Sequence, residues 1–146
     1  MTLAVYLRQN RLLLVLPFLL LAVVYAPVFP GMFRVWMDDP NYSHGFLVPP
    51  IAAWFAWKSW PELRERPVEQ SAAGFLLILA GMALLAGGLA IDELYTSRVS
   101  FIVILAGLVQ VFFGTAVLRV LALPIAFLLF MVPLPYTLYD ALALPL

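Results

Sequence analysis

Apolar residues fill five long stretches of this 146-residue chain, and this feature limits most strongly what the chain can fold into. Hydrophobic residues make up 65% of the sequence and charged residues 11%, whereas soluble domains contain about 25% charged residues. A soluble domain of this length leaves much of its surface in water and could not bury so many apolar side chains. A membrane-spanning helix needs roughly 20 mostly apolar residues. The stretches that meet or approach this length are Leu12–Phe29, Ser43–Trp60, Ala72–Ile91, Ser97–Ala116 and Val120–Pro133.

The five stretches predict an all-α fold: a polytopic bundle of about five transmembrane helices that forms one membrane-embedded domain over residues 1–146. The first stretch follows Arg8 and Arg11, as in a signal peptide. A signal peptide has a shorter apolar region of about 7–15 residues and ends at small residues. Because Leu12–Phe29 is longer and ends near two prolines, we interpret it as a retained first span.

The basic residues predict that the N-terminus is cytoplasmic. In this orientation most of the basic residues lie on the inner side, as the positive-inside rule requires; they are Arg8, Arg11, Lys58, Arg64, Arg66 and Arg119. Arg34 and Arg98 fall on the outer side. Each of these two could bind an anionic group or pair with Asp38, Asp92 or Glu93, and we favour pairing.

Several functions are made improbable by what the sequence lacks. There is no cysteine, and His44 is the only histidine, so the chain offers no disulfide, no thiolate metal site and no Cys nucleophile. We expect no metal and no cofactor. No basic stripe indicates nucleic-acid binding, and the expected partner is membrane lipid.

Small and polar residues inside the spans predict contacts between helices. Ala83 with Gly87, and Ala86 with Ala90, have the four-residue spacing that lets two helices approach closely in lipid, and we expect them to form a contact within the bundle. Gln110 lies inside the fourth span, where a polar side chain usually hydrogen-bonds to a neighbouring helix.

The densest polar segment precedes the second span and is the best candidate for a site. Ser43 could cap the following helix, and Gly45 permits either a positive φ or a close approach of another group. Pro49-Pro50 suit a first helical turn and would kink a helix interior, so the second span should begin irregularly. Irregular backbone at membrane depth must be buried in protein or line a wet cavity. The candidate site residues are Asp38, Asp39, Asn41, Tyr42, Ser43, His44 and Gly45.

His44 has three possible roles. It could act as a general base, donate a hydrogen bond to a substrate carbonyl, or be a structural partner of Asp38 or Asp39. The two carboxylates are adjacent in sequence and need not converge, so they give little support to an acid–base pair.

Two motifs resemble those of a known family. Tyr42-Ser43-His44-Gly45 followed by Pro49, within Trp36–Pro49, resembles the N-terminal signature of the exosortase/archaeosortase family. The stretch from Pro124 to Pro135, continuing through Asp140 to Leu146, resembles the apolar helix of that family that ends in a Pro-x-Pro turn.

The resemblance implies an activity, partners and a location. Exosortases are cysteine transpeptidases or proteases, and hence hydrolases, of the inner membrane of exopolysaccharide-producing bacteria. They cleave and sort proteins that carry a C-terminal signal of the PEP-CTERM type, so PEP-CTERM substrate proteins are the implied partners. The Cys, Arg and His of the family lie downstream of the Pro-x-Pro turn.

This chain ends just after that turn and lacks cysteine, so we expect the N-terminal part of an exosortase, truncated and inactive alone. It then contains no catalytic residue, and His44 belongs to the signature rather than to the catalytic group of the family. Two other readings remain open. One is a small non-enzymatic membrane protein or accessory subunit, and the other is a transporter fragment with its site at the broken start of the second span.

Overall fold

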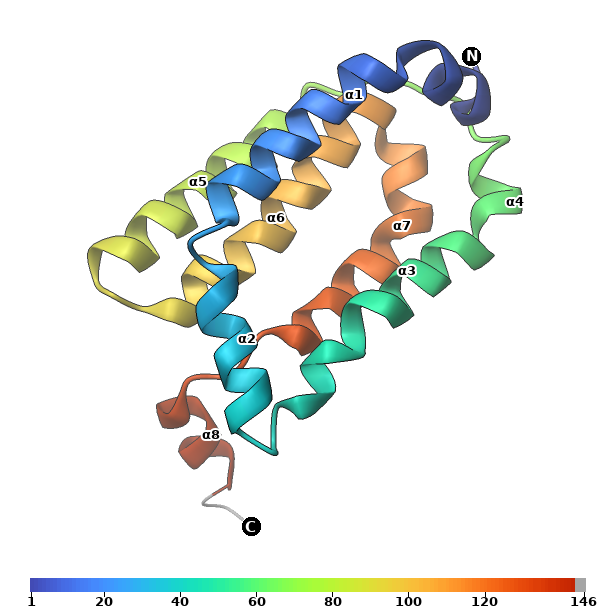
Figure 1. The fold of residues 1–146 in the computed structure, drawn as a ribbon. Helices are drawn as coiled ribbons and strands as arrows, with labels where there is room; N and C mark the ends of the chain where they lie inside the picture. Colours follow the sequence, from blue (N-terminus) through green and yellow to red (C-terminus); the bar gives the residue numbers. More distant parts are fainter. Residues whose placement is uncertain (144–146) are drawn as a thin grey trace.

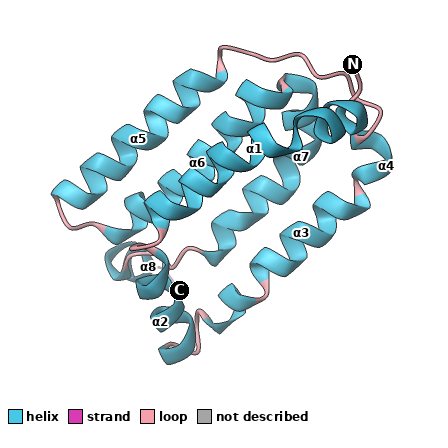
Figure 2. Ribbon diagram, turned by 45° about the horizontal axis from the view of Figure 1, so that its top comes forward, coloured by secondary structure: helices cyan, strands magenta, loops and turns pink. Residues whose placement is uncertain are grey.

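The computed structural model describes residues 1–143, and this part of the chain is entirely helical, without a sheet (Figures 1 and 2). The all-α prediction is therefore confirmed for the described residues. The first half contains α1 (Leu3–Tyr25), α2 (Phe29–Asp38), the 3-10 helix η1 (Ser43–Phe46), α3 (Val48–Lys58) and α4 (Trp60–Leu63). The second half contains α5 (Gly74–Ala90), α6 (Leu94–Phe113), α7 (Thr115–Phe127), the 3-10 helix η2 (Leu128–Met131) and α8 (Tyr136–Ala143).

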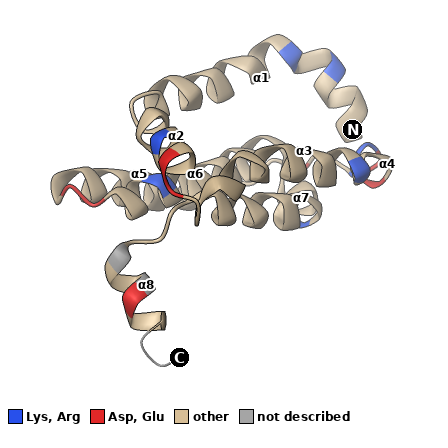
Figure 3. Ribbon diagram, turned by 60° about the horizontal axis from the view of Figure 1, so that its bottom comes forward, with Lys and Arg blue, Asp and Glu red and all other residues tan. Residues whose placement is uncertain are grey.

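Helix length and composition mark the membrane-spanning candidates. Within the described residues, α1 and α6 are long and apolar enough to cross a membrane, with 23 and 20 residues. Gly74–Ala90 and Thr115–Met131 are shorter apolar helices. Charged residues gather near the N-terminus and α4 and around α2, whereas α5 and the second half of α1 carry none (Figure 3).

Two helices depart from the expected boundaries. We expected α1 to begin at Leu12, but it begins at Leu3 and is kinked at Asn10, where φ is −113° and ψ is 15°. The Asn10 side chain donates a hydrogen bond to the Tyr6 carbonyl, 3.1 Å away, and competes with regular helical bonding. α2 lies between the first two predicted spans, where we predicted no helix. Its proline lies in the first turn, where the missing N–H is harmless.

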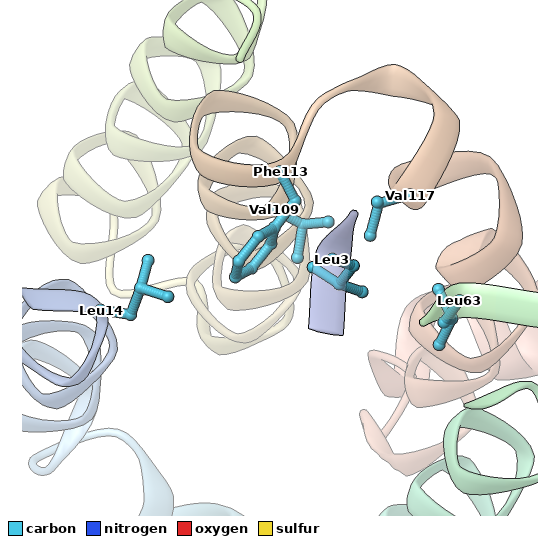
Figure 4. Close-up of a cluster of buried hydrophobic side chains, with 6 residues drawn as sticks. All are labelled: Leu3, Leu14, Leu63, Val109, Phe113 and Val117. Carbon is cyan, nitrogen blue, oxygen red and sulfur yellow. The ribbon is translucent and has the colours of Figure 1, made fainter. Parts of the chain in front are cut away.

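The N-terminus is fixed to the segment between α4 and α5. The Leu3 amide donates to the Arg66 carbonyl, and the Val68 amide donates to the Met1 carbonyl, each over 2.9 Å. Glu69 in turn pairs with Gly114, whose φ of 94° and contact with the Glu69 backbone leave no room for a Cβ atom. A buried apolar cluster closes this end of the molecule (Figure 4): Leu3, Leu14, Leu63, Val109, Phe113 and Val117.

α5 and α6 pack closely through glycines spaced seven residues apart. Gly74, Gly81 and Gly88 are buried, and a Cβ atom on any of them would collide with α6. A seven-residue repeat keeps one face of a helix against its partner along the whole contact. We had expected two other pairs of small residues on this helix, Ala83 with Gly87 and Ala86 with Ala90, to form a contact within the bundle. That prediction is wrong, because the following residues are exposed on α5: Ala83, Ala86, Gly87 and Ala90.

Polar side chains join neighbouring helices. The Ser100 hydroxyl on α6 donates to the Ser97 carbonyl over 2.5 Å, so the buried Tyr25 hydroxyl on α1 must be the donor in its own 2.5 Å bond to Ser100. Gln110 Nε2 donates to the Thr115 hydroxyl at the start of α7, 3.3 Å away. The prediction that Gln110 bonds to a neighbouring helix is confirmed.

Candidate functional site

Two segments distant in sequence meet at the end of the molecule that carries α2. The indole Nε1 of Trp36 donates to the Met131 carbonyl over 2.8 Å, and the Tyr42 hydroxyl donates to the Leu134 carbonyl over 3.4 Å. Leu134 lies between Pro133 and Pro135. The helix α2, the 3-10 helix η1 and the Pro-x-Pro turn therefore form one unit, and its buried apolar core consists of Met32, Trp36, Val48, Ile102, Met131 and Val132.

Gly45 is buried because it supports the Trp36 ring. A Cβ atom at this position would overlap the indole of Trp36, a side chain that is only 3% exposed. Among the described residues the positive φ values belong to Asp92 and Gly114. Of the two roles that we considered for Gly45, a close approach of another group is the correct one.

The turn before η1 is held by local hydrogen bonds. Asp39 is extended, with φ −109° and ψ 113°, as expected for a residue before proline. Its carboxylate accepts a hydrogen bond from the Asn41 amide, 2.9 Å away. The Ser43 hydroxyl donates back to the Pro40 carbonyl over 3.1 Å. Our prediction that Ser43 caps the following helix is wrong, because no side-chain oxygen of the described residues accepts a capping hydrogen bond at the start of η1 or of α3.

The second expected span begins irregularly, as predicted. η1 precedes α3, and a proline occupies the first turn of α3. The structure gathers Gly45 and the half-buried Tyr42 against the second motif. The other predicted site residues, apart from the half-buried Asp39, lie exposed beside this contact: Asp38, Asn41, Ser43 and His44. The rings of Tyr42 and His44 are 6.5 Å apart between centroids.

A cavity of about 420 Å³ adjoins the two motifs. Its walls come from the end of α2, the start of α6 and the Pro133–Pro135 turn, and they include Tyr42, Tyr95 and Arg98. The guanidinium group of Arg98 is buried, and its Nε atom has no hydrogen-bond partner in the described part of the chain. The sequence marked Arg98 as unusual by its predicted side, but it did not reveal the cavity.

Glu93 caps α6 at the edge of this cavity. Its two carboxylate oxygens accept hydrogen bonds from the amides of Tyr95, at 2.8 Å, and Thr96, at 2.7 Å. Burial acts to raise the pKa of Glu93, but these hydrogen bonds and the charge of Arg98 outweigh it, and the pKa lies below its ordinary value. Sequence reasoning missed this cap, because Glu is not among the usual capping residues.

The expected pairing of the two outer arginines is not observed. Within residues 1–143 the ion pairs are Arg64–Glu65 and Arg66–Glu62. Arg98 and Glu93 therefore interact electrostatically without a direct ion-pair contact. Arg34 is exposed on α2. No group of three potential metal ligands occurs among the described residues.

Comparison with known proteins gives a family. The model of the transmembrane exosortase family (Exosortase_EpsH) matches residues 36–146, a range that contains both motifs. No curated protein and no solved structure matches the chain.

Proposed function

We propose a function for this chain on the basis of its family: it belongs to the transmembrane exosortase family. In this proposal the chain forms the substrate-docking part of a cysteine transpeptidase or protease that cleaves and sorts PEP-CTERM proteins. The observation that carries the proposal is the contact between the two motifs. The bonds from Trp36 to Met131 and from Tyr42 to Leu134 make one surface of segments almost a hundred residues apart.

We place this surface on the outer side of the bacterial inner membrane, in a chain with five crossings and a cytoplasmic N-terminus. The crossings are α1, η1 with α3, α5, α6, and α7 with η2. In support, the N-terminus, the segment before α5 and the Gly114 turn lie together at one end. That end carries Arg64 and Arg66, in agreement with the positive-inside rule.

The chemistry divides between docking and bond cleavage. Acyl transfer by a cysteine enzyme requires a thiolate nucleophile and a group that moves protons. The sequence has no cysteine, so we assign no catalytic residue within it. The part proposed for these residues is to bind and orient the sorting signal. The exposed His44 beside Tyr42 offers a donor or an acceptor to a peptide backbone.

Substitution of the signature residues tests this function in cells that contain a PEP-CTERM reporter protein and in which the cysteine-bearing part of the enzyme is also present. We expect His44→Ala to reduce the processed fraction of the reporter, and Tyr42→Phe to reduce it less, because the ring remains while the bond to Leu134 is lost. Gly87→Ala is the matched control, since its new methyl group meets no atom within 4 Å beyond its chain neighbours and the nearby backbone of its own helix.

The level of each variant in the membrane is measured in parallel, so that lost protein is not mistaken for lost function. Normal processing in both signature variants would contradict the docking role. A reporter that is never processed in cells containing the wild-type gene would favour the non-enzymatic membrane protein instead.

A further inference from the structure

A buried arginine without a contacting counter-charge is the least explained feature of the molecule. Arg98 is 6% exposed and lies one turn into α6, a candidate membrane span. Its Nε atom is buried without a hydrogen-bond partner in residues 1–143. Removing a charge from water is unfavourable unless a partner compensates, and an ionisable group at membrane depth is a functional candidate for that reason.

The nearest acidic group is already engaged elsewhere. Both carboxylate oxygens of Glu93 accept backbone hydrogen bonds at the start of α6. No ion pair joins Arg98 to a described acidic side chain. The charge of Glu93 acts on Arg98 from a distance, and no ion-pair contact joins the two side chains.

The surroundings of Arg98 leave room for a ligand. The side chain reaches toward α2, where the Cβ position of Gly31 would be 3.4 Å from the Arg98 Nη2 atom. Arg98 also lines the cavity of about 420 Å³ that Tyr42, Tyr95 and the Pro133–Pro135 turn enclose. The cavity thus combines one buried cation with tyrosine and proline walls.

We propose that Arg98 binds a carboxylate of the substrate peptide in this cavity and thereby helps to select the sorting signal. The inference rests on the proposed function, because it names the group in the substrate that the docking surface recognises. A guanidinium group matches a carboxylate with two parallel hydrogen bonds. The ionised Glu93 at the cavity edge adds negative charge and disfavours a dianionic phosphate. Proline and tyrosine walls suit an extended peptide better than a pair of acyl chains.

Peptide binding to the chain in lipid nanodiscs tests the proposal without requiring catalysis. The probe is a fluorescein-labelled peptide of the PEP-CTERM type, measured by fluorescence polarisation. We expect Arg98→Gln to raise the Kd at least about tenfold, as for a lost hydrogen bond to a charged group. Arg98→Lys should lose less affinity. Arg34→Gln is the matched control, an exposed arginine at the same end of the molecule, and should leave the Kd unchanged.

Variants of the peptide identify the carboxylate. Replacing each Glu with Gln tests the side chains, and a C-terminal amide tests the terminal carboxylate. The correct replacement should weaken binding to the wild type and have no further effect on Arg98→Gln. Equal affinity of the wild type and Arg98→Gln for the original peptide would overturn the proposal. It would also be overturned if Arg98 bound the phosphatidylglycerol headgroup and not the peptide.

Two further measurements distinguish failure of the carboxylate site from failure of the proposed docking function. If Arg98 were half of a structural ion pair, Arg98→Gln would lower the unfolding temperature; we expect no decrease, because the change removes an unpaired charge. If the wild type binds no sorting peptide, the proposed function fails. The carboxylate site then stands only if N-acetyl-glutamate amide raises the unfolding temperature of the wild type and not of Arg98→Gln, and it falls if no shift occurs.

Discussion

Alanine at Gly45 should destabilise the docking surface from within. The new methyl group would overlap the Trp36 indole, which is buried among Met32, Val48 and Met131 and cannot move without disturbing them. Inserting a methyl group into a packed core costs about 1–3 kcal/mol. If the indole shifts, its hydrogen bond to the Met131 carbonyl is also lost, and an unsatisfied buried group costs about 1–3 kcal/mol more. We expect a total loss of about 2–6 kcal/mol in the free energy of unfolding.

Equilibrium unfolding in mixed micelles measures this loss. Gly87→Ala provides the matched control, because its methyl group meets no neighbour within 4 Å; it should be neutral or stabilise α5 by about 0.5–1 kcal/mol, as expected for Ala in place of Gly in a helix. Near-ultraviolet circular dichroism should report a changed Trp36 environment in Gly45→Ala alone.

A double-mutant cycle tests the cause. In a Trp36→Leu background the obstructing ring is absent, so Gly45→Ala should have a much smaller effect, with a coupling energy of about 1–3 kcal/mol. The reasoning would be refuted if Gly45→Ala alone changed stability by less than about 0.5 kcal/mol, the range of ordinary surface substitutions. It would also be refuted if the effects of the two substitutions simply added.

Three other predictions concern hydrogen bonds, pH and orientation. Tyr25→Phe should cost about 1 kcal/mol of unfolding free energy, and Ser100→Ala should cost more, about 1–3 kcal/mol, because it leaves the buried Tyr25 hydroxyl without an acceptor. Glu93 has a lowered pKa, so its contribution to stability is present above its ordinary value of 4.5 and is lost as the pH falls through the lowered value. Glu93→Gln should therefore flatten the acid side of the stability profile, measured by thermal unfolding between pH 3 and pH 7. Because the chain has no cysteine, single cysteines report orientation: a membrane-impermeant maleimide should label Asp38→Cys in intact spheroplasts and Glu65→Cys only after lysis, and the opposite result would reverse the topology.

The helical class and the two motifs could be predicted from sequence because each has a local cause. Long apolar runs exclude sheets and soluble folds at once. The irregular start of the second span follows from the limited geometry of its prolines, and Gly45 was recognisable as a position that needs space. What the sequence did not reveal was that Trp36 fills this space, since the two residues belong to different elements.

The errors concern side-chain direction, which depends on partners. α5 carries small residues on more than one face, and only the position of α6 selects Gly74, Gly81 and Gly88 for the contact. Likewise, the predicted pairing of Arg98 does not form with Glu93, although the two residues are only five positions apart in sequence. The free amides at the start of α6 compete for the Glu93 carboxylate, and sequence spacing alone does not decide that competition.

The link between the N-terminus and the segment after α4 bears on how the protein is made. Met1 and Leu3 are synthesised before their backbone partners, Val68 and Arg66, which follow more than sixty residues later in the chain. The apolar cluster around Leu3 is completed only by Val117 on α7. During synthesis the first turns of α1 therefore lack their packing partners until most of the bundle has been inserted into the membrane. A chaperone or insertase that shields this segment would act on it early, and assembly of the bundle would end its need for protection.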